Sequence, residues 1–342
     1  MKFQRIFCVF SPLYWTLTYL RNKAYDTGLY SSTSFTTPTI CVGNITVGGT
    51  GKTPHVEYIC SLLQDTFRTA ILSRGYKRKT KGYLLASPLT TVDELGDEPY
   101  FLYKKLQKTN VAVCEKRVLG VTKLLQDNPT IQAIILDDAF QHRAIKSGLN
   151  IVLIDYNRPI WNDCVFPGGM LREGTYALER AHSIIITKCP NNLTNTEMEM
   201  WKRKLHITKQ TLFFTTIKYT SIYEAESKKQ HDIPTILSSK HILLVTGIAQ
   251  PKPMYTFISQ YCKDITHLNF ADHHIYTNDD YALILQQYKT YRTTIVTTEK
   301  DAPKILEITR NQLPIYVLSI GITFLNDSET EFQSLIQTHI SK

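Results

Sequence analysis

Several features that define other classes of protein are missing from this sequence. Glycine and proline are sparse, with 15 and 14 of 342 residues, so a long disordered region is not expected. The seven cysteines include no CxxC pair, which disfavours a disulfide framework or a zinc site and favours a reducing cytoplasm. No GxGxxG motif is present, so a dinucleotide-binding fold is not expected. What remains is a globular composition, 43% hydrophobic and 20% charged, in a chain long enough for two domains.

The sequence also has fewer acidic than basic residues. Lysine and arginine number 39 against 30 aspartates and glutamates, which gives a formal net charge of +9. An excess of positive charge favours an acidic partner, such as nucleic acid, an anionic membrane surface or a phosphorylated substrate. Charge alone does not choose among these, and the sequence contains no recognised nucleic-acid-binding module.

The N-terminal segment contains an apolar stretch that is too short to cross a membrane. As a helix, residues 6–20 would span about 22 Å, less than the roughly 30 Å of a hydrocarbon core. A cleaved signal peptide is disfavoured because no small-x-small site follows. Ser11 as N-cap, followed by Pro12, predicts a helix that either packs on the domain or lies in a membrane interface. The aromatic and basic content slightly favours the membrane. Its apolar face comprises Leu13, Leu17, Leu20 and Ala24.

Short apolar runs alternate with helical patterns along the chain, which is typical of parallel α/β structure. The first series of predicted strands is 39–42, 69–73, 111–114, 133–136, 150–154 and 183–187. After a polar, charged stretch near 212–240, a second series follows at 241–247, 265–270, 293–298 and 315–322. We therefore expect two α/β domains of unequal size.

The stretch VGNITVGGTGKTP lies between a predicted strand and a helical pattern, the context of a phosphate-binding loop. Its glycines allow backbone N–H groups to surround an anion, Lys52 is expected to reach the phosphates, and Thr53 to bind Mg²⁺. Thr46 stands where the usual pattern has its first glycine, and a glycine-rich turn without a ligand is the alternative. The predicted nucleotide-binding residues are Gly48, Gly49, Thr50, Gly51, Lys52 and Thr53.

A second element of a nucleotide site is the stretch AIILDDAFQHR. It predicts a strand that ends in Asp137 and Asp138, similar to a Walker B element. Carboxylates at the C-terminal end of a parallel strand lie beside the phosphate loop, where Mg²⁺ would bind. The pattern does not say which aspartate ligates the metal, and a helix N-cap is the alternative interpretation.

Three further stretches carry charged groups suited to the acceptor side of phosphoryl transfer. ELGDEPYFL places Asp97 and Glu98 before a helical pattern, where a carboxylate would accept the proton of an acceptor hydroxyl. FADHHIYT places His273 and His274 after a strand of the second domain, and Arg172 in PGGMLRE would clamp phosphate. Taken alone, each is more often structural than catalytic.

Together these stretches resemble one known family. VGNITVGGTGKTP, ILSRGYKR, GDEP, LDDAFQHR, FPGGMLRE, ITKCP, FADHH and TTEKDA follow one another between about residues 39 and 304. The ordered set resembles tetraacyldisaccharide 4′-kinase, the lipid A 4′-kinase of Gram-negative bacteria. The resemblance implies that a residue such as Thr46 is usual at its position in the loop.

The resemblance implies transfer of the γ-phosphate of ATP, with Mg²⁺, to the 4′-hydroxyl of a tetraacyldisaccharide 1-phosphate. It implies Asp97 as general base assisted by His273, with His274 as an alternative, and Lys52 and Arg172 as further catalytic residues. The Mg²⁺ ligands are expected among Thr53, Asp138, Asp137 and Glu98. The alternative function is a P-loop ATPase or nucleotide-dependent switch without a lipid substrate.

The implied fold is α/β, with a P-loop NTPase-like domain of mostly parallel sheet and a second, smaller α/β domain joined by a β-stranded linker. The expected boundaries are 1–30 for a membrane-associating helix, 31–211 for the kinase domain, 212–240 for the linker and 241–342 for the smaller domain, which contributes to the active site. The expected partners are the lipid disaccharide and an anionic membrane surface at the cytoplasmic face of the inner membrane. We expect a peripheral or monotopic monomer that does not bind nucleic acid.

Overall fold

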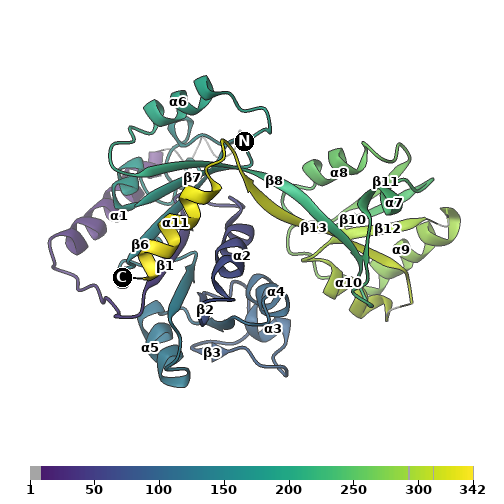
Figure 1. Ribbon diagram of the computed structural model, residues 1–342, viewed down its shortest axis with the longest axis horizontal. Helices are drawn as coiled ribbons and strands as arrows, with labels where there is room; N and C mark the ends of the chain where they lie inside the picture. The colour runs from purple at the N-terminus through teal and green to yellow at the C-terminus, as the bar shows by residue number, and fades with distance from the viewer. Residues whose placement is uncertain (1–8, 292, 311, 342) are drawn as a thin grey trace. The chain divides into compact units, whose positions relative to one another are not determined.

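The computed structural model describes residues 9–291, 293–310 and 312–341 (Figure 1). The chain forms two compact units. The larger one is built from the chain up to Ile217 and from Ile322 onward, and the smaller one is Lys218–Gly321. Both boundaries fall inside long strands, which are β8 (Thr211–Glu224) and β13 (Ile315–Phe324). The expected stretch 212–240 thus contains most of β8, followed by short elements of the smaller unit.

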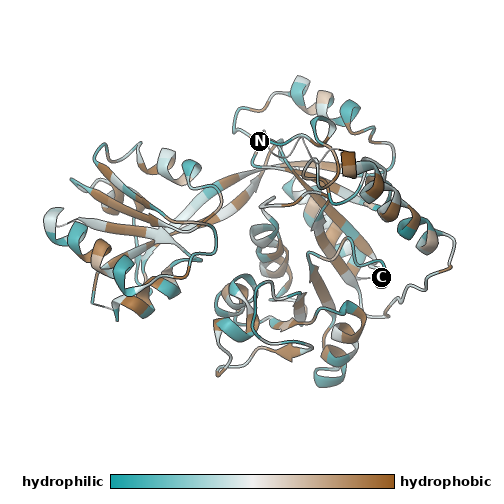
Figure 2. Ribbon diagram, turned by 180° about the vertical axis from the view of Figure 1, so that it is seen from behind, coloured by the Kyte–Doolittle hydropathy of each residue, from teal (hydrophilic) through white to brown (hydrophobic). Residues whose placement is uncertain are grey.

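The larger unit is built on a mostly parallel sheet with the strand order β8-β7-β6-β1-β5-β2-β4-β3. Neighbouring strands run parallel as far as β4, and only the short β3 is antiparallel to its neighbour. Figure 2 shows that the strands consist mainly of hydrophobic residues. This is expected for a sheet with both faces covered. The strands are β1 (Thr39–Asn44), β2 (Thr69–Ser73), β3 (Leu84–Leu85), β4 (Asn110–Val113), β5 (Ala133–Asp137), β6 (Leu149–Asp155) and β7 (Ser183–Thr187).

Helices cover both faces of this sheet. One face packs against α2, α4 and α11, and the other packs against α5 and α6. The α-helices of the unit are α1 (Ser11–Asp26), α2 (Lys52–Leu63), α3 (Val92–Leu95), α4 (Asp97–Lys105), α5 (Arg117–Asp127), α6 (Asn195–Lys204) and α11 (Glu329–Ile340). Two 3₁₀ helices, Ile160–Asn162 and Thr175–Arg180, lie between β6 and β7. The α/β fold with a mostly parallel sheet, expected from the sequence, is confirmed.

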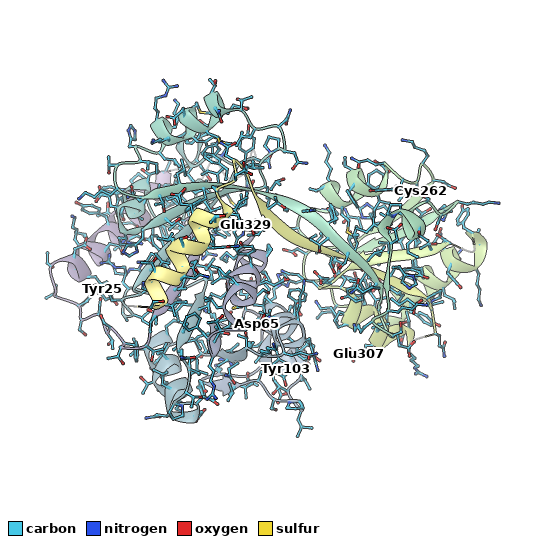
Figure 3. All side chains as sticks on the ribbon, viewed as in Figure 1. Tyr25, Asp65, Tyr103, Cys262, Glu307 and Glu329 are labelled. Atoms are coloured by element: carbon cyan, nitrogen blue, oxygen red, sulfur yellow. The ribbon has the colours of Figure 1, made fainter. Side chains whose placement is uncertain are left out.

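The C-terminal helix α11 belongs to the larger unit, although residues 241–342 were expected to form the smaller one. Figure 1 shows α11 beside α2, β1 and β6. Its buried residues Phe332, Ile336 and Ile340 recur every fourth position, so they form one apolar face against the core. The Tyr58 hydroxyl of α2 also donates to Glu329, labelled at the start of α11 in Figure 3, over 2.6 Å.

The smaller unit has its own parallel strands in the order β11-β10-β12-β13, and short β9 pairs antiparallel with β8. Alternate residues of β10 enter two separate cores, so helices cover both of its faces. The elements are β9 (Gln230–His231), α7 (Ile233–Leu237), β10 (Ile242–Thr246), α8 (Lys252–Ile258), β11 (Ile265–Asn269), α9 (Asn278–Tyr291), β12 (Thr294–Thr298) and α10 (Ala302–Thr309).

Helix α1 is attached to the larger unit by its polar side. The expected N-cap role of Ser11 is wrong, because Phe10 occupies that position and the Ser11 hydroxyl donates to the Val165 carbonyl over 2.9 Å. Asn22, which is buried, donates to the Glu173 carboxylate over 2.7 Å. The apolar face points outward instead, with Leu13, Leu17 and Leu20 exposed by 62%, 59% and 58%.

No described helix is both long and apolar enough to cross a membrane. Residues 1–8, which form the beginning of the expected membrane-associating segment 1–30, lie outside the described residues.

We expect Phe332→Ala to destabilise the larger unit by about 3–5 kcal/mol, the usual cost of truncating a buried phenylalanine. Phe332 is fully buried against Phe213 and Phe324, with ring centroids at 5.3 and 4.8 Å. Urea unfolding followed by tryptophan fluorescence measures this, because Trp15, Trp161 and Trp201 all belong to the larger unit.

The matched control is Gln337→Ala, which changes an exposed position of the same helix and should leave stability within about 0.5 kcal/mol. Equal unfolding midpoints for the Phe332 variant and the wild type would contradict the packing described for α11.

Candidate active site

The glycine loop between β1 and α2 forms a cradle whose tip, residues 47–49, is exposed. Gly48 and Gly51 have φ angles of +100° and +85°, which side chains rarely allow, and Gly51 is the N-cap of α2. A Cβ atom added to Gly49 would meet no described atom within 4 Å. The exposed loop tip therefore leaves room for an anion, and the N-terminus of α2 favours negative charge there.

The loop needs no glycine at Thr46 because its backbone is extended at that point. Thr46 forms an isolated antiparallel bridge with Leu171, and the neighbouring Val47 N–H donates to the Met170 carbonyl over 2.7 Å. The Arg172 N–H donates to the Ile45 carbonyl over 2.7 Å. The start of the loop is thus paired with the segment that carries Arg172.

Buried polar side chains hold the rest of the loop. Asn44 donates to the Thr50 hydroxyl over 2.9 Å, and the Thr187 hydroxyl donates to the Thr50 carbonyl over 2.8 Å. The ring of His55 lies 2.7 Å from the Gly51 carbonyl and 3.1 Å from the Thr215 hydroxyl. Burial lowers the pKa of His55 to about 4, so the ring is neutral. Because a carbonyl can only accept, we assign the proton to Nδ1 and the acceptor role to Nε2.

Asp137 and Asp138 follow one another at the end of β5 but have different surroundings. Asp137 is 3% exposed, and its Oδ2 accepts from the Ser73 hydroxyl over 2.9 Å. Its Oδ1 accepts no hydrogen bond from the described residues. Burial, followed by the negative charges of Glu98 and Asp138, raises the pKa of Asp137 to about 6. A buried carboxylate oxygen without a donor is suited to a cation.

Asp138 already has cationic partners. Its Oδ1 lies 2.9 Å from Arg172 and 3.7 Å from Lys52. Although burial raises its pKa, Lys52 and Arg172 together hold the pKa of the Asp138 carboxyl below its usual value. The structure therefore brings together Lys52, Asp138 and Arg172, three of the predicted site residues, beside the first turn of α2, which contains Thr53.

A complete metal site made of protein side chains is not present in the described part of the chain, where no three His, Cys, Asp or Glu side chains cluster suitably. The donor set is instead a carboxylate pair and the buried Thr53 hydroxyl, beside a cradle for anionic oxygens. Oxygen donors of this kind fit Mg²⁺, which usually binds through one or two carboxylates, waters and substrate phosphates.

Asp97 and Glu98 form the first turn of α4. Their turn is fixed by Gly96, which has a φ of +91° and on which an added Cβ would lie 2.9 Å from the Tyr76 carbonyl. Tyr76 belongs to the RGYKR stretch, so two of the motifs pack against each other. Both acidic side chains are partly exposed, and the charge of Glu98 contributes to the raised pKa of Asp137.

His273 and His274 belong to the smaller unit and have different environments. His273 has a φ of +60°, and its N–H donates to the Gly247 carbonyl over 3.2 Å. The buried Asp301 in turn accepts from the Gly247 N–H over 2.9 Å. The ring of His274 is engaged elsewhere, because it lies 3.0 Å from the Asp280 carboxylate and stacks on Phe270.

Reasoning from the sequence missed Asp155 and His55 of the loop region, and it quoted Lys188 only within ITKCP, without a role. Asp155 ends β6, and Lys188 follows β7, so both lie at the carboxyl ends of parallel strands, where ligands usually bind. Their position after a predicted strand was the available signal. His55 gave no signal of its own, because a histidine in an apolar helix is more often a core residue.

The fold and the glycine loop define a P-loop NTPase-like α/β protein. A family model described as tetraacyldisaccharide-1-P 4′-kinase matches residues 3–341, and the chain belongs to this family. It is 41% identical to the tetraacyldisaccharide 4′-kinase of Phocaeicola vulgatus over 97% of this chain and 94% of that protein. It is 38% identical to the Bacteroides thetaiotaomicron enzyme of the same name, over 95% of this chain and 90% of that protein.

Among solved structures, the chain is similar to the "apo" form of LpxK from Aquifex aeolicus, crystallised in complex with ATP. The identity is 27% and the TM-score 0.77, with 99% of both chains covered. The resemblance to tetraacyldisaccharide 4′-kinases stated from the sequence motifs is therefore confirmed, and with it the kinase class of the enzyme.

We expect Asp137→Asn to stabilise the metal-free protein at pH 8 by about 1–3 kcal/mol, because it removes a buried charge but keeps an acceptor for Ser73. A raised pKa means that the protonated form is favoured in the folded state. The ionised carboxylate therefore destabilises the fold above the folded pKa of about 6, and this cost vanishes at lower pH. The gain of the variant should disappear as the pH falls from 6 towards 4.

Urea unfolding in chelator-containing buffer at several pH values measures the effect. The control is Asp65→Asn, which changes an exposed carboxylate that is labelled in Figure 3. A gain that is the same at pH 5 and pH 8 would contradict the electrostatic explanation.

Proposed function

We propose that this chain transfers the γ-phosphate of ATP to the 4′-hydroxyl of a tetraacyldisaccharide 1-phosphate, with Mg²⁺ as cofactor. The observation that carries the proposal is the open glycine cradle beside the cluster of Lys52, Asp138 and Arg172. The names of its relatives and the ATP complex of the Aquifex aeolicus protein support this choice of substrates.

The loop residues and α2 bind the phosphates in this proposal. Backbone N–H groups between Gly48 and Thr53 contact the phosphate oxygens, and the ammonium group of Lys52 neutralises the terminal phosphates. Arg172 stabilises the charge that develops during transfer. Its guanidinium is already oriented by Asp138, so little reorganisation is needed when substrate binds.

Thr53, Asp137, Asp138 and Glu98 are the residues that would hold Mg²⁺. When bound, the ion neutralises charge on the phosphates and thereby favours attack at the γ-phosphorus. The Asp137 Oδ1 atom is the best direct ligand of the set, because Asp138 Oδ1 is paired with two cations.

Asp97 is the general base in this mechanism. Its carboxylate accepts the proton of the 4′-hydroxyl as that oxygen forms a bond to the γ-phosphorus, and the bond between phosphorus and the ADP oxygen breaks. The family resemblance assigns His273 the role of assisting Asp97. His274 remains the alternative for this role, and its ring lies 3.0 Å from the Asp280 carboxylate.

We expect Asp97→Asn to reduce phosphate transfer at least about 100-fold while ATP affinity changes less than about twofold, since the amide cannot accept the proton. Labelled ATP and purified disaccharide 1-phosphate measure transfer, and calorimetry measures ATP binding. The control is Asp93→Asn, which changes an exposed carboxylate a few residues away. Loss of ATP binding in the Asp97 variant would reassign this residue to the nucleotide site.

Membrane contact through α1, at the cytoplasmic face of the inner membrane, is part of the same proposal. The leucine face of α1 is exposed, whereas its polar side is attached to the protein. Such a helix can bury its apolar face at the level of lipid headgroups, and Arg21 and Lys23 would attract anionic lipids. The membrane surface also delivers the lipid acceptor to a chain that acts as a monomer.

We expect the triple variant Leu13→Ser, Leu17→Ser, Leu20→Ser to lose at least about tenfold in affinity for anionic vesicles, because about nine apolar carbons are removed from the interface. Sedimentation with phosphatidylglycerol-containing vesicles measures this. The matched control is Leu89→Ser, which changes a leucine that is 90% exposed outside α1. Unchanged vesicle binding in the triple variant would refute the membrane role of this face.

A further inference from the structure

Two cations flank the glycine loop on the side of β6 and β7, of which Lys188 belongs to the ITKCP motif and Arg158 to none of the motifs. Lys188 follows β7, and Arg158 lies three residues beyond the end of β6. Asp155, which is 2% exposed, lies 2.7 Å from the Lys188 ammonium and 3.7 Å from Arg158 Nε. In the sheet order, β1 lies between β6 and β5. Lys52 and Arg172, which contact Asp138 after β5, therefore belong to the opposite side of the loop.

The guanidinium of Arg158 lies directly against the loop. A Cβ atom added to Gly48 would be 3.1 Å from Arg158 Nη1 and 3.4 Å from Nη2. Nη1 donates to the Val47 carbonyl over 3.3 Å. A side chain at position 48 would force the guanidinium to shift by a few tenths of an ångström, and the φ of +100° also favours glycine there.

Most donors of this guanidinium find no acceptor in the described protein. Arg158 Nε and Nη2 are shielded from solvent, and neither makes a hydrogen bond to a described residue. An arginine has five N–H donors, and leaving buried donors unsatisfied costs about 1–3 kcal/mol per group. The side chain as a whole is 33% exposed, so a ligand in the cradle could reach it. Lys188 differs, because its ammonium already contacts Asp155 and the Gly49 carbonyl.

Four basic side chains lie around the loop, which favours an anionic ligand there. They are Lys52, Arg158, Arg172 and Lys188, and the carboxylates in these ion pairs are Asp138 and Asp155. A polyphosphate is the chemical class that supplies several negative charges and many acceptor oxygens within a few ångströms.

We infer that Arg158 binds the polyphosphate of the nucleoside triphosphate, on the opposite side of the loop from Lys52. Asp155 positions Arg158 and Lys188. When the partly exposed guanidinium turns towards the ligand, its spare donors bind phosphate oxygens, for which its planar fork is well suited. The inference rests on the proposed function, in that it takes ATP as the nucleotide.

Calorimetric titration of the full-length protein with ATP and with AMP, both in Mg²⁺ buffer, tests the inference. Arg158→Gln should weaken ATP binding at least about tenfold and AMP binding less than about twofold, because the α-phosphate alone does not extend along the loop. The ATP affinity of Arg158→Lys should lie between those of Arg158→Gln and the wild type, since lysine keeps the charge but lacks the planar fork of donors. Lys79→Gln is the matched control, because it removes an equal charge from a side chain that is 76% exposed.

Two results would overturn the inference. One is unchanged ATP affinity in Arg158→Gln, and the other is an equal loss of ATP and AMP affinity, which would indicate a collapsed loop. Melting temperatures without nucleotide report any such collapse independently. Lys52→Ala separates the inference from the proposed function. If that variant loses ATP affinity while Arg158→Gln does not, only the inference fails, whereas a wild-type protein that does not bind ATP refutes both.

Discussion

The rest of the site depends on one electrostatic constraint, which is the placement of two adjacent carboxylates at the buried end of β5. Like charges this close, in a site largely removed from water, cannot both ionise unless positive charge is supplied. Lys52 and Arg172 supply it to Asp138, whereas Asp137 responds with a raised pKa. Asp138 is held ionised, and Asp137 keeps one oxygen without a hydrogen-bond donor. Together the two carboxylates can position a cation, so their unfavourable burial contributes to the proposed chemistry.

The same constraint connects the N-terminal helix with the nucleotide loop. The backbone of Arg172, which contacts Asp138, is paired with Ile45, and the Arg172 carbonyl accepts from the Tyr14 hydroxyl of α1 over 3.2 Å. The next residue, Glu173, is fully buried and bonded to Asn22 of α1. A helix attached by its polar side therefore stabilises the segment that neutralises Asp138, while its leucines remain exposed to surroundings outside the protein.

Much of the larger unit could be predicted because parallel strands that are buried on both faces are continuous apolar runs. The ends of these strands also carry the motifs that resemble a known family. The predictions failed where a residue's role depends on a distant partner. Ser11 looked like an N-cap, but its hydroxyl is used by Val165, which is 154 residues away. Helix α11 was assigned to the smaller domain for the same reason, since an amphipathic pattern does not specify which hydrophobic core the helix covers. Arg158 was missed because its importance comes from contact with Gly48, which no local pattern records.

The spare donors and the open acceptor around the loop have a thermodynamic consequence. Unsatisfied groups such as Arg158 Nη2 and Asp137 Oδ1 lower the stability of the protein without its ligands, so part of the binding free energy relieves that cost. Binding of nucleotide and binding of metal should then be strongly coupled, because the nucleotide satisfies the spare arginine donors and the metal satisfies the spare aspartate oxygen. The anion offsets the excess of cations around the glycines, and the cation offsets the paired aspartates. A loop whose polar groups are all satisfied only when both are present favours the complete substrate over either component alone.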